Sequence, residues 1–306
     1  MKPGVVCLLA AVALGQTTFR SDVRLINVSA VVRDSSGKLV DNLGQGDFKI
    51  LEDGVPQKLA FFARSNDVPL NLGLVVDISG SQAAFVRAHQ HDLKAFLDRA
   101  LSQRDRAFLL CFASHPRLIT QYTSSGKQLI DALEGYMGTN DKVNYPLLGP
   151  PEIRSGSAFY DAVYHASNQM FQNVERGRKA LVIFSDGEDN TSAHNMLETI
   201  ELAQTNDVVL FCVRYTETRG GRWTARNKYG RGVMERVAFE TGGADFDASE
   251  KDVSAHFRDI GEHLRSSYEL AYHSSNPPDD RTFHKIAIRV KQAGYTVRAK
   301  TGYFAK

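Results

Sequence analysis

The order of apolar and polar side chains predicts a small all-β unit near the start of the chain. Residues 22–33 alternate between the two kinds, which is typical of a strand with one buried face. Residues 47–63 contain two further apolar stretches around Asp53-Gly54, a dipeptide typical of tight hairpin turns. We therefore expect β-strands between residues 20 and 67.

From residue 68 to residue 266 the pattern changes to apolar strands that alternate with helical segments. The strands are apolar on both faces, which indicates a sheet covered on both sides. This alternation is typical of a doubly wound, mostly parallel sheet in an α/β domain. The expected strands are 70–79, 106–113, 117–123, 179–187, 208–215 and 244–248, and the expected helices are 82–101, 126–137, 157–174, 192–206, 232–243 and 252–268.

Alternating strands return at the end of the chain, in residues 267–306. The three expected strands are 268–274, 282–292 and 295–305. Two or three strands alone are only marginally stable. We therefore expect the N- and C-terminal strands to form one small β-sandwich, with the α/β domain inserted between them. The alternative is two separate β appendages that each lean on the α/β domain.

The first residues have the layout of a secretory signal peptide. Lys2 is followed by an apolar run over 5–14, and Ala13 and Gly15 are the small residues expected before a cut. The run is too short to span a bilayer comfortably. We expect residues 1–15 to be removed, and the protein to be exported to the periplasm or secreted, with no stable transmembrane segment. A buried N-terminal helix is the alternative.

Composition and charge exclude several classes of partner. A hydrophobic fraction of 42% and a charged fraction of 24% are ordinary for a globular protein. The net charge of +2 gives no reason to expect binding to nucleic acid or to anionic membranes. Cys111 and Cys212 lie in apolar strand-like runs, so we expect buried thiols rather than a disulfide.

The first strand of the α/β domain ends in oxygen-bearing side chains. Asp77, Ser79 and Ser81 stand at alternate positions there, and Asp186 stands at the end of a later strand. Ser157 opens a helix after a long loop. Doubly wound sheets bind ligands beyond the carboxyl ends of their strands, where the strand order reverses. If the two strands are neighbours, these five side chains meet in one crevice.

These side chains favour a single hard divalent cation. None of them is Cys or His, which argues against zinc and copper and for Mg²⁺, Mn²⁺ or Ca²⁺. Two carboxylates balance a dication, and three hydroxyls add ligands without charge, so the ion keeps an open coordination position. Mg²⁺ is preferred because an octahedral shell that retains waters suits few side-chain ligands. An Asp or Glu carboxylate of a partner protein would complete that shell.

The same residues resemble the metal-ion-dependent adhesion site of von Willebrand factor type A domains. That family has Asp-x-Ser-x-Ser, a distant Thr and a later Asp. Here "DISGS" matches the first part through Asp77, Ser79 and Ser81, and "SDGED" matches the last part through Asp186. Ser157 stands where relatives have Thr and lacks the methyl group that stiffens χ1. The resemblance implies direct ligation by Ser79 and Ser81, ligation by Ser157 directly or through water, and carboxylates that neutralise charge and position waters.

The resemblance covers residues 70–265 and implies a Rossmann-like type A domain. The flanking strands are similar to those of a bacterial exported subfamily related to these domains. This likeness implies a fold and a location, and little about biological role. The sequence thus predicts an exported, non-enzymatic protein-binding module that recognises a partner carboxylate in an adhesion-type, metal-dependent way.

Other interpretations of these residues remain open. Asp77, Ser79 and Ser81 also fit ordinary helix capping. In a structural or scaffold protein of the envelope, the metal site would be vestigial or purely stabilising. A serine hydrolase is a remote alternative, because no Gly-x-Ser-x-Gly elbow surrounds Ser79 or Ser81 and no histidine is assigned to them.

Two long segments have no assigned function. Residues 138–156 are rich in Pro and Gly, and residues 216–232 carry several arginines and Trp223. The second segment could bind acidic groups, although a solvated loop is the simpler interpretation. Glu188, Asp189 and Asn190 are interpreted as loop and cap residues of a helix that begins near Ser192.

Overall fold

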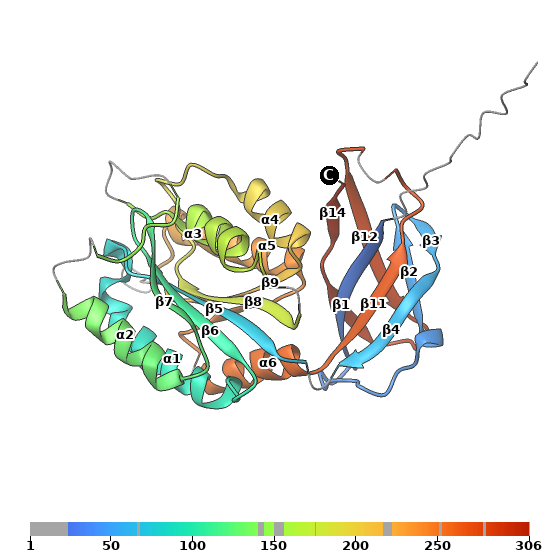
Figure 1. The fold of residues 1–306 in the computed structure, drawn as a ribbon, viewed down its shortest axis with the longest axis horizontal. Helices are drawn as coiled ribbons and strands as arrows, with labels where there is room; N and C mark the ends of the chain where they lie inside the picture. Colours follow the sequence, from blue (N-terminus) through green and yellow to red (C-terminus); the bar gives the residue numbers. More distant parts are fainter. Residues whose placement is uncertain are drawn as a thin grey trace, which may run out of the picture.

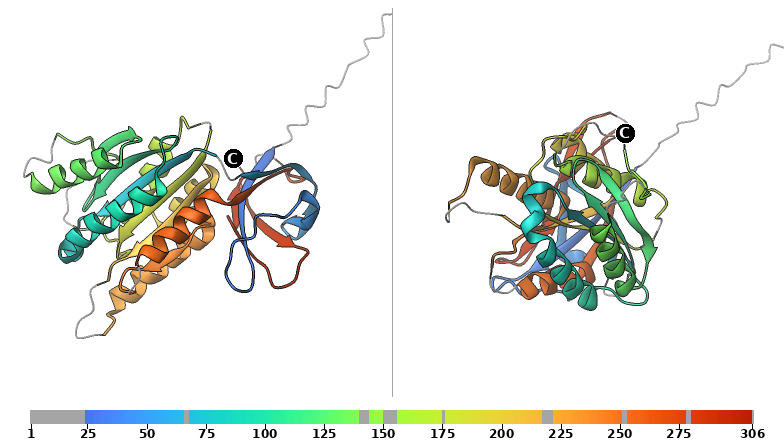
Figure 2. Two further views of the ribbon diagram at one scale, coloured as in Figure 1. Left: turned by 90° about the horizontal axis from the view of Figure 1, so that it is seen from below. Right: turned by 90° about the vertical axis from the view of Figure 1, so that its left-hand side faces the viewer.

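The computed structural model describes residues 24–65, 68–139, 144–149, 156–174, 176–216, 222–250, 253–277 and 280–305. Figure 1 shows two bodies side by side along the long axis, an α/β domain and a β-sandwich. Figure 2 shows the same division from two further directions. The predicted signal peptide, residues 1–15, lies outside the described residues.

Six strands form the sheet of the α/β domain. Their bounds are β5 Leu70–Asp77, β6 Arg106–Phe112, β7 Pro116–Thr123, β8 Arg178–Ser185, β9 Val208–Arg214 and β10 Asp245–Asp247. The order across the sheet is β10-β9-β8-β5-β6-β7, and all neighbours are parallel except β7, which is antiparallel to β6. The strand order therefore reverses between β5 and β8, which is the switch point of a doubly wound sheet.

Helices cover both faces of this sheet (Figure 1). The helices α1 Val86–Ala100, α2 Gly126–Gly138 and α6 Val253–Arg265 enclose one apolar core, and α3 Phe159–His165, α4 Met196–Thr205 and α5 Ala225–Thr241 enclose the other. All eight residues of β5 are buried, as expected for a strand between two helical layers. The predicted doubly wound, mostly parallel sheet is confirmed.

The sandwich combines strands from both ends of the chain. Its strands are β1 Leu25–Arg33, β2 Phe48–Glu52, β3 Val55–Gln57, β4 Leu59–Ser65, β11 Ser267–His273, β12 Phe283–Val290, β13 Thr296–Ala299 and β14 Gly302–Phe304. One sheet has the order β13-β1-β11-β4 and the other β14-β12-β2-β3. Each sheet thus contains strands from both ends of the chain. The predicted single sandwich is confirmed, and the alternative of two separate appendages is wrong.

Two segments that the sequence suggested as single strands are divided between the two sheets. The second strand of the expected hairpin is split at Lys58 into β3, which pairs with β2, and β4, which pairs with β11. Residues 295–305 are likewise split at Lys300 and Thr301 into β13 and β14. At the second break, Val297, Ala299 and Tyr303 keep the alternate spacing, so the pattern does not show where the chain changes sheets. At the first break, Gln57 and Lys58 interrupt the apolar residues, but a short polar interruption does not show a change of sheet. The hairpin turn itself is confirmed, with positive φ at Asp53 (51°) and Gly54 (85°).

Two further expectations concern membranes and thiols. No helix in the described ranges is both long and apolar enough to cross a bilayer. Cys111 and Cys212 are buried and form no disulfide within the part of the chain that the structure describes, as expected.

Candidate cation site at the switch point of the sheet

The two predicted carboxylates meet at the switch point. Asp77 is the last residue of β5, and Asp186 directly follows β8, the neighbouring strand. Their side chains are close enough for the charge of Asp186 to act on Asp77: burial first, and Asp186 second, raise the pKa of Asp77 from 3.8 to about 7. The structure therefore brings these two residues together as the strand pattern predicted.

Among the described residues, neither carboxylate has a basic partner. Asp77 is 0% exposed and Asp186 is 3% exposed, and the ion pairs among the described residues include neither of them. Asp77 accepts hydrogen bonds from the Ser79 N–H (2.8 Å) and the Ser185 hydroxyl (2.6 Å). Asp186 accepts from Gln82 Nε2 (2.9 Å) and the Glu188 N–H (3.0 Å). Burying two ionised carboxylates that receive hydrogen bonds only from neutral groups costs free energy. The cost falls if one carboxylate is protonated or if a cation lies between them.

The two serines after β5 lead from the interior to the surface. Ser79 is buried and Ser81 is exposed, and their hydroxyl oxygens lie 3.2 Å apart. Ser79 is the N-cap of the 3₁₀ turn Gly80–Phe85, yet its side chain makes no capping hydrogen bond. Capping therefore does not account for the Ser79 hydroxyl, although Asp77 does accept a bond from the turn.

Ser157 is held against the loop that begins at Asp186. Its N–H donates to Asn190 Oδ1 (2.9 Å), and its carbonyl accepts from the N–H groups of Asn190 (3.0 Å) and Thr191 (3.3 Å). The next residue, Ala158, donates to the carbonyl of Ala113, directly after β6. The Ser157 hydroxyl is buried and has no hydrogen-bond partner within the described residues. A buried hydroxyl of this kind normally has a partner, so it fits a ligand to an ion.

Two supporting residues were missed by sequence reasoning. Ser185 donates to Asp77, and the fully buried Gln82 donates to Asp186 and to the carbonyl of Tyr215 (3.1 Å). Ser185 could have been found from the sequence, because a polar residue at the last position of an apolar strand indicates a side chain at the site. Gln82 carries no such signal, because a glutamine in the first turn after a strand is usually exposed.

The residues after Asp186 have different roles from those expected. The helix expected near Ser192 is α4, which begins at Met196 and is capped by Asn195 in a capping box with Glu198. Asp189 instead accepts a hydrogen bond from the N–H of Tyr160, in the first turn of α3 (3.0 Å). Glu188, Asp189 and Asn190 do lie in a loop, as expected. Their expected role as caps of the next helix is wrong, because Asp189 bonds to α3, which is distant in sequence, and a local pattern does not reveal such a partner.

The expected loop 216–232 is shorter than its composition suggested. Residues 217–221 lie outside the described residues, and α5 begins at Ala225 with Thr224 as N-cap in a capping box with Asn227. Arg226 pairs with Glu188 (2.9 Å), and the guanidinium of Arg231 lies 5.8 Å from the Trp223 ring. Part of this basic segment is therefore folded helix, and the interpretation of the whole segment as a solvated loop is wrong.

The two histidines that follow the serines in the sequence, His89 and His91, lie on α1. In the described part of the chain, no hydrogen bond joins a histidine to Ser79 or Ser81. His89 is buried in α1 with its ring 4.4 Å from that of Tyr215, and burial lowers its pKa to about 4. His91, on the same helix, is exposed. These histidines therefore have the packing and surface roles that their helical positions predict.

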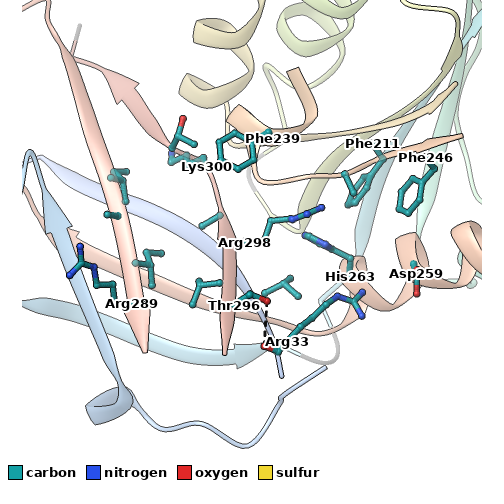
Figure 3. Close-up of a pocket in the computed structure, with 18 residues that line it drawn as sticks. Arg33, Phe211, Phe239, Phe246, Asp259, His263, Arg289, Thr296, Arg298 and Lys300 are labelled. Atoms are coloured by element: carbon teal, nitrogen blue, oxygen red, sulfur yellow. Dashed lines mark hydrogen bonds between the residues drawn. The ribbon is translucent and has the colours of Figure 1, made fainter. Parts of the chain in front are cut away.

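A cavity elsewhere in the molecule does not include the candidate site. It has a volume of about 510 Å³ and lies between the α/β domain and the sandwich (Figure 3). Phe211 and His263 line it from the first domain, and Arg33 and Arg298 line it from the second. The predicted ligands are not among its lining residues, and a single ion needs no cavity of this size.

Comparisons with known proteins find solved structures of similar fold. Proximal thread matrix protein 1 from the mussel byssus, solved with a zinc-occupied MIDAS motif, has a TM-score of 0.50 at 15% identity over 70% of this chain and 50% of that chain. A von Willebrand factor type A protein from Catenulispora acidiphila has a TM-score of 0.49 at 10% identity, covering 94% and 74% of the two chains. An aerotolerance-related membrane protein from Bacteroides fragilis has a TM-score of 0.48 at 15% identity, covering 64% and 98%. No family model and no curated protein matches the chain.

Proposed function

We propose that this chain, whose central domain has the von Willebrand factor type A fold, is an exported, non-enzymatic protein-binding module. In this proposal Asp77, Ser79, Ser81, Ser157 and Asp186 hold one divalent cation, and the ion binds a carboxylate of a partner protein. The observation that carries it is the pair of buried carboxylates at the switch point, which have no basic partner among the described residues.

The residues present fit a cation on two further counts. The Ser157 hydroxyl is buried without a hydrogen-bond partner in the described part of the chain, so it is available as a ligand. The exposure of Ser81 leaves one side of the group open to the surface, where an outside carboxylate can reach. Burial and, second, the charge of Asp186 raise the pKa of Asp77, and an ion between the two carboxylates would offset both effects.

The donor set decides which ions to test. Five oxygen donors favour Mg²⁺, with Mn²⁺ and Ca²⁺ as alternatives. The mussel protein holds zinc at its MIDAS motif, so zinc belongs in the comparison as well. We propose that Ser79 and Ser81 bind the ion directly and that Asp77 and Asp186 act through charge and through positioned waters.

The proposal also covers the cellular location of the protein and the bounds of its domains. We propose that residues 1–15 are a signal peptide and that the protein acts in the periplasm or outside the cell. The α/β domain would extend over residues 68–266, between sandwich strands from 20–67 and 267–306. Mass spectrometry of the mature N-terminus in the native host tests the first point, and an uncut Met1 or a protein retained in the cytoplasm would contradict it.

Affinity capture from the native cell envelope tests the binding function. The wild-type chain should retain a partner in magnesium and release it in excess chelator, and Asp77→Ala should retain none. Asp98→Ala is the matched control, since Asp98 is an exposed carboxylate on α1. A partner held equally by all three chains in chelator would contradict the proposal. If the ion raised the melting temperature and left capture unchanged, the purely structural alternative would hold instead.

A further inference from the structure

A second group of metal-binding side chains lies at α3, apart from the five oxygen donors. Asp161 and His165 stand four residues apart on that helix and therefore on the same face. His194 belongs to the segment that precedes α4. One potential ligand atom of each of the three residues lies within 4.8 Å of those of the other two.

The carboxylate and one imidazole of this group are already held in place. Asp161 accepts hydrogen bonds from the N–H groups of Ala193 and His194, both at 3.0 Å. Nδ1 of His194 lies 2.7 Å from Asp161 Oδ1, and the His194 ring stacks on Tyr164 with 3.6 Å between ring centres. Backbone donors and ring stacking of this kind orient metal ligands before the ion arrives.

His165 supplies a nitrogen that nothing else uses. Its side chain is 8% exposed, and its Nε2 has no hydrogen-bond partner within the described residues. Gly149 lies against this nitrogen with φ of 88°, and a Cβ there would be 2.3 Å from Nε2. His165 Nε2 therefore lies against a glycine and lacks a hydrogen-bond partner in the described part of the chain, while its Nδ1 lies 3.3 Å from Gln169 Nε2. A buried imidazole nitrogen without a partner is costly in free energy unless a ligand occupies it.

We propose that Asp161, His165 and His194 form a site for Zn²⁺, separate from the cation site at the switch point. Two imidazoles and one carboxylate suit zinc and are poor ligands for Mg²⁺ and Ca²⁺. The His194 side chain is 24% exposed, which leaves a path to solvent for the ion and for a fourth, water ligand. This inference does not depend on the proposed function.

Zinc at this position would tie together two segments that carry the other site. Helix α3 begins two residues after Ser157, and His194 lies in the segment that starts at Asp186. An ion that binds α3 and this segment at once would restrict their relative motion. Zinc would thus support the switch-point site without being part of it.

Zinc titration of the full-length chain carrying Asp77→Ala tests the proposal, because that change removes the first site. The account predicts one bound zinc ion, and one cobalt ion with the visible absorption of a nitrogen- and oxygen-bound site. His194→Phe in the same background keeps a ring to stack on Tyr164 and should weaken zinc binding at least about tenfold. His91→Phe, at an exposed histidine, is the matched control and should leave the affinity unchanged.

The inference is overturned if the Asp77→Ala chain takes up no zinc, or if His194→Phe binds zinc as tightly as its parent. It is also overturned if magnesium displaces the bound cobalt at similar concentrations. Circular dichroism in chelator shows whether His194→Phe is folded, and His194→Gln replaces it if it is not.

Discussion

Asp77 is the residue on which the account of the switch-point site depends most. Its carboxyl group is fully buried, lies beside the acidic Asp186, and receives hydrogen bonds only from Ser79 and Ser185 among the described residues. The Asp-x-Ser-x-Ser pattern identified Asp77 and Ser79 from the sequence alone. The repulsion between the two acids could not be predicted from sequence, because it depends on which strands are neighbours.

The raised pKa of Asp77 makes ion binding depend on pH. In the ion-free protein its pKa is about 7, so below that pH the incoming cation must displace a proton. Magnesium affinity should therefore fall as the pH drops below about 7, by up to about tenfold per unit. Calorimetric titration at several pH values between about 5 and 8, in buffers of different ionisation enthalpy, measures both the affinity and the proton release. An affinity that stays constant over this range would contradict the assignment of Asp77.

The raised pKa of Asp77 also affects the free energy of unfolding of the ion-free protein. A group whose folded pKa is raised stabilises the fold in its protonated form. The contribution of Asp77 is present below its unfolded value of 3.8 and is lost as the pH rises through about 7. Stabilisation by magnesium should therefore be largest above that pH.

Ser157→Ala separates a ligand role from a structural one. The Ser157 hydroxyl is buried without a partner in the described part of the chain, so its removal should not lower stability in chelator. If the hydroxyl binds the ion, magnesium affinity should fall about tenfold. Ser167→Ala is a matched control, since its hydroxyl is also buried and unpartnered there. Equal affinities of the two variants would show that Ser157 is not a ligand.

At the scale of elements, strand ends and helix starts position the site. The apolar strands β5 and β8 and the helices around them were predictable from periodicity, because burial on one or two faces leaves a regular pattern. The contacts of the loop between β8 and α4 were not predictable from periodicity. Its residues Asp189 and Asn190 bond to Tyr160 and Ser157, some thirty positions earlier in the chain, and such partners leave no local pattern.

Gly187 holds that loop against α5 and should not tolerate a side chain. Its φ is 74°, and a Cβ would lie 2.4 Å from the Gly230 carbonyl oxygen. Gly187→Ala should therefore cost about 1–3 kcal/mol in the free energy of unfolding and weaken magnesium binding through Asp186. Gly232→Ala, in open space on α5, should instead stabilise the protein by up to about 1 kcal/mol. Urea unfolding measures both, and a Gly187→Ala chain as stable as the wild type would contradict this role.

At the scale of the whole molecule, the sandwich closes only when both chain ends are present. Strand β11 lies between β1 and β4, and β12 pairs with β2. The marginal stability of each end alone predicted this arrangement. The crossings between sheets at Lys58 and at Lys300 were not predictable, because nothing in the apolar pattern on either side shows that the chain moves to the other sheet. The two domains also meet directly, for example where the Thr301 N–H donates to the Glu240 carbonyl (3.0 Å).

Removal of the C-terminal strands should unfold the N-terminal ones. A chain that ends at Arg265 lacks β11 to β14. Strand β1 then loses both of its neighbours, β4 loses β11 and β2 loses β12. Hydrogen exchange should then show residues 25–65 unprotected, whereas they are protected in the full chain. Retained protection of these residues would mean that the N-terminal strands fold without the C-terminal ones.

The most direct test of the central claim is a calorimetric titration of the ion-free protein with magnesium, repeated with manganese and calcium. The account predicts one bound ion for the wild-type chain and none for Asp77→Asn, which keeps the shape of the side chain and removes its charge. Failure of the wild-type chain to bind any of the three ions, or equal binding by Asp77→Asn, would contradict it.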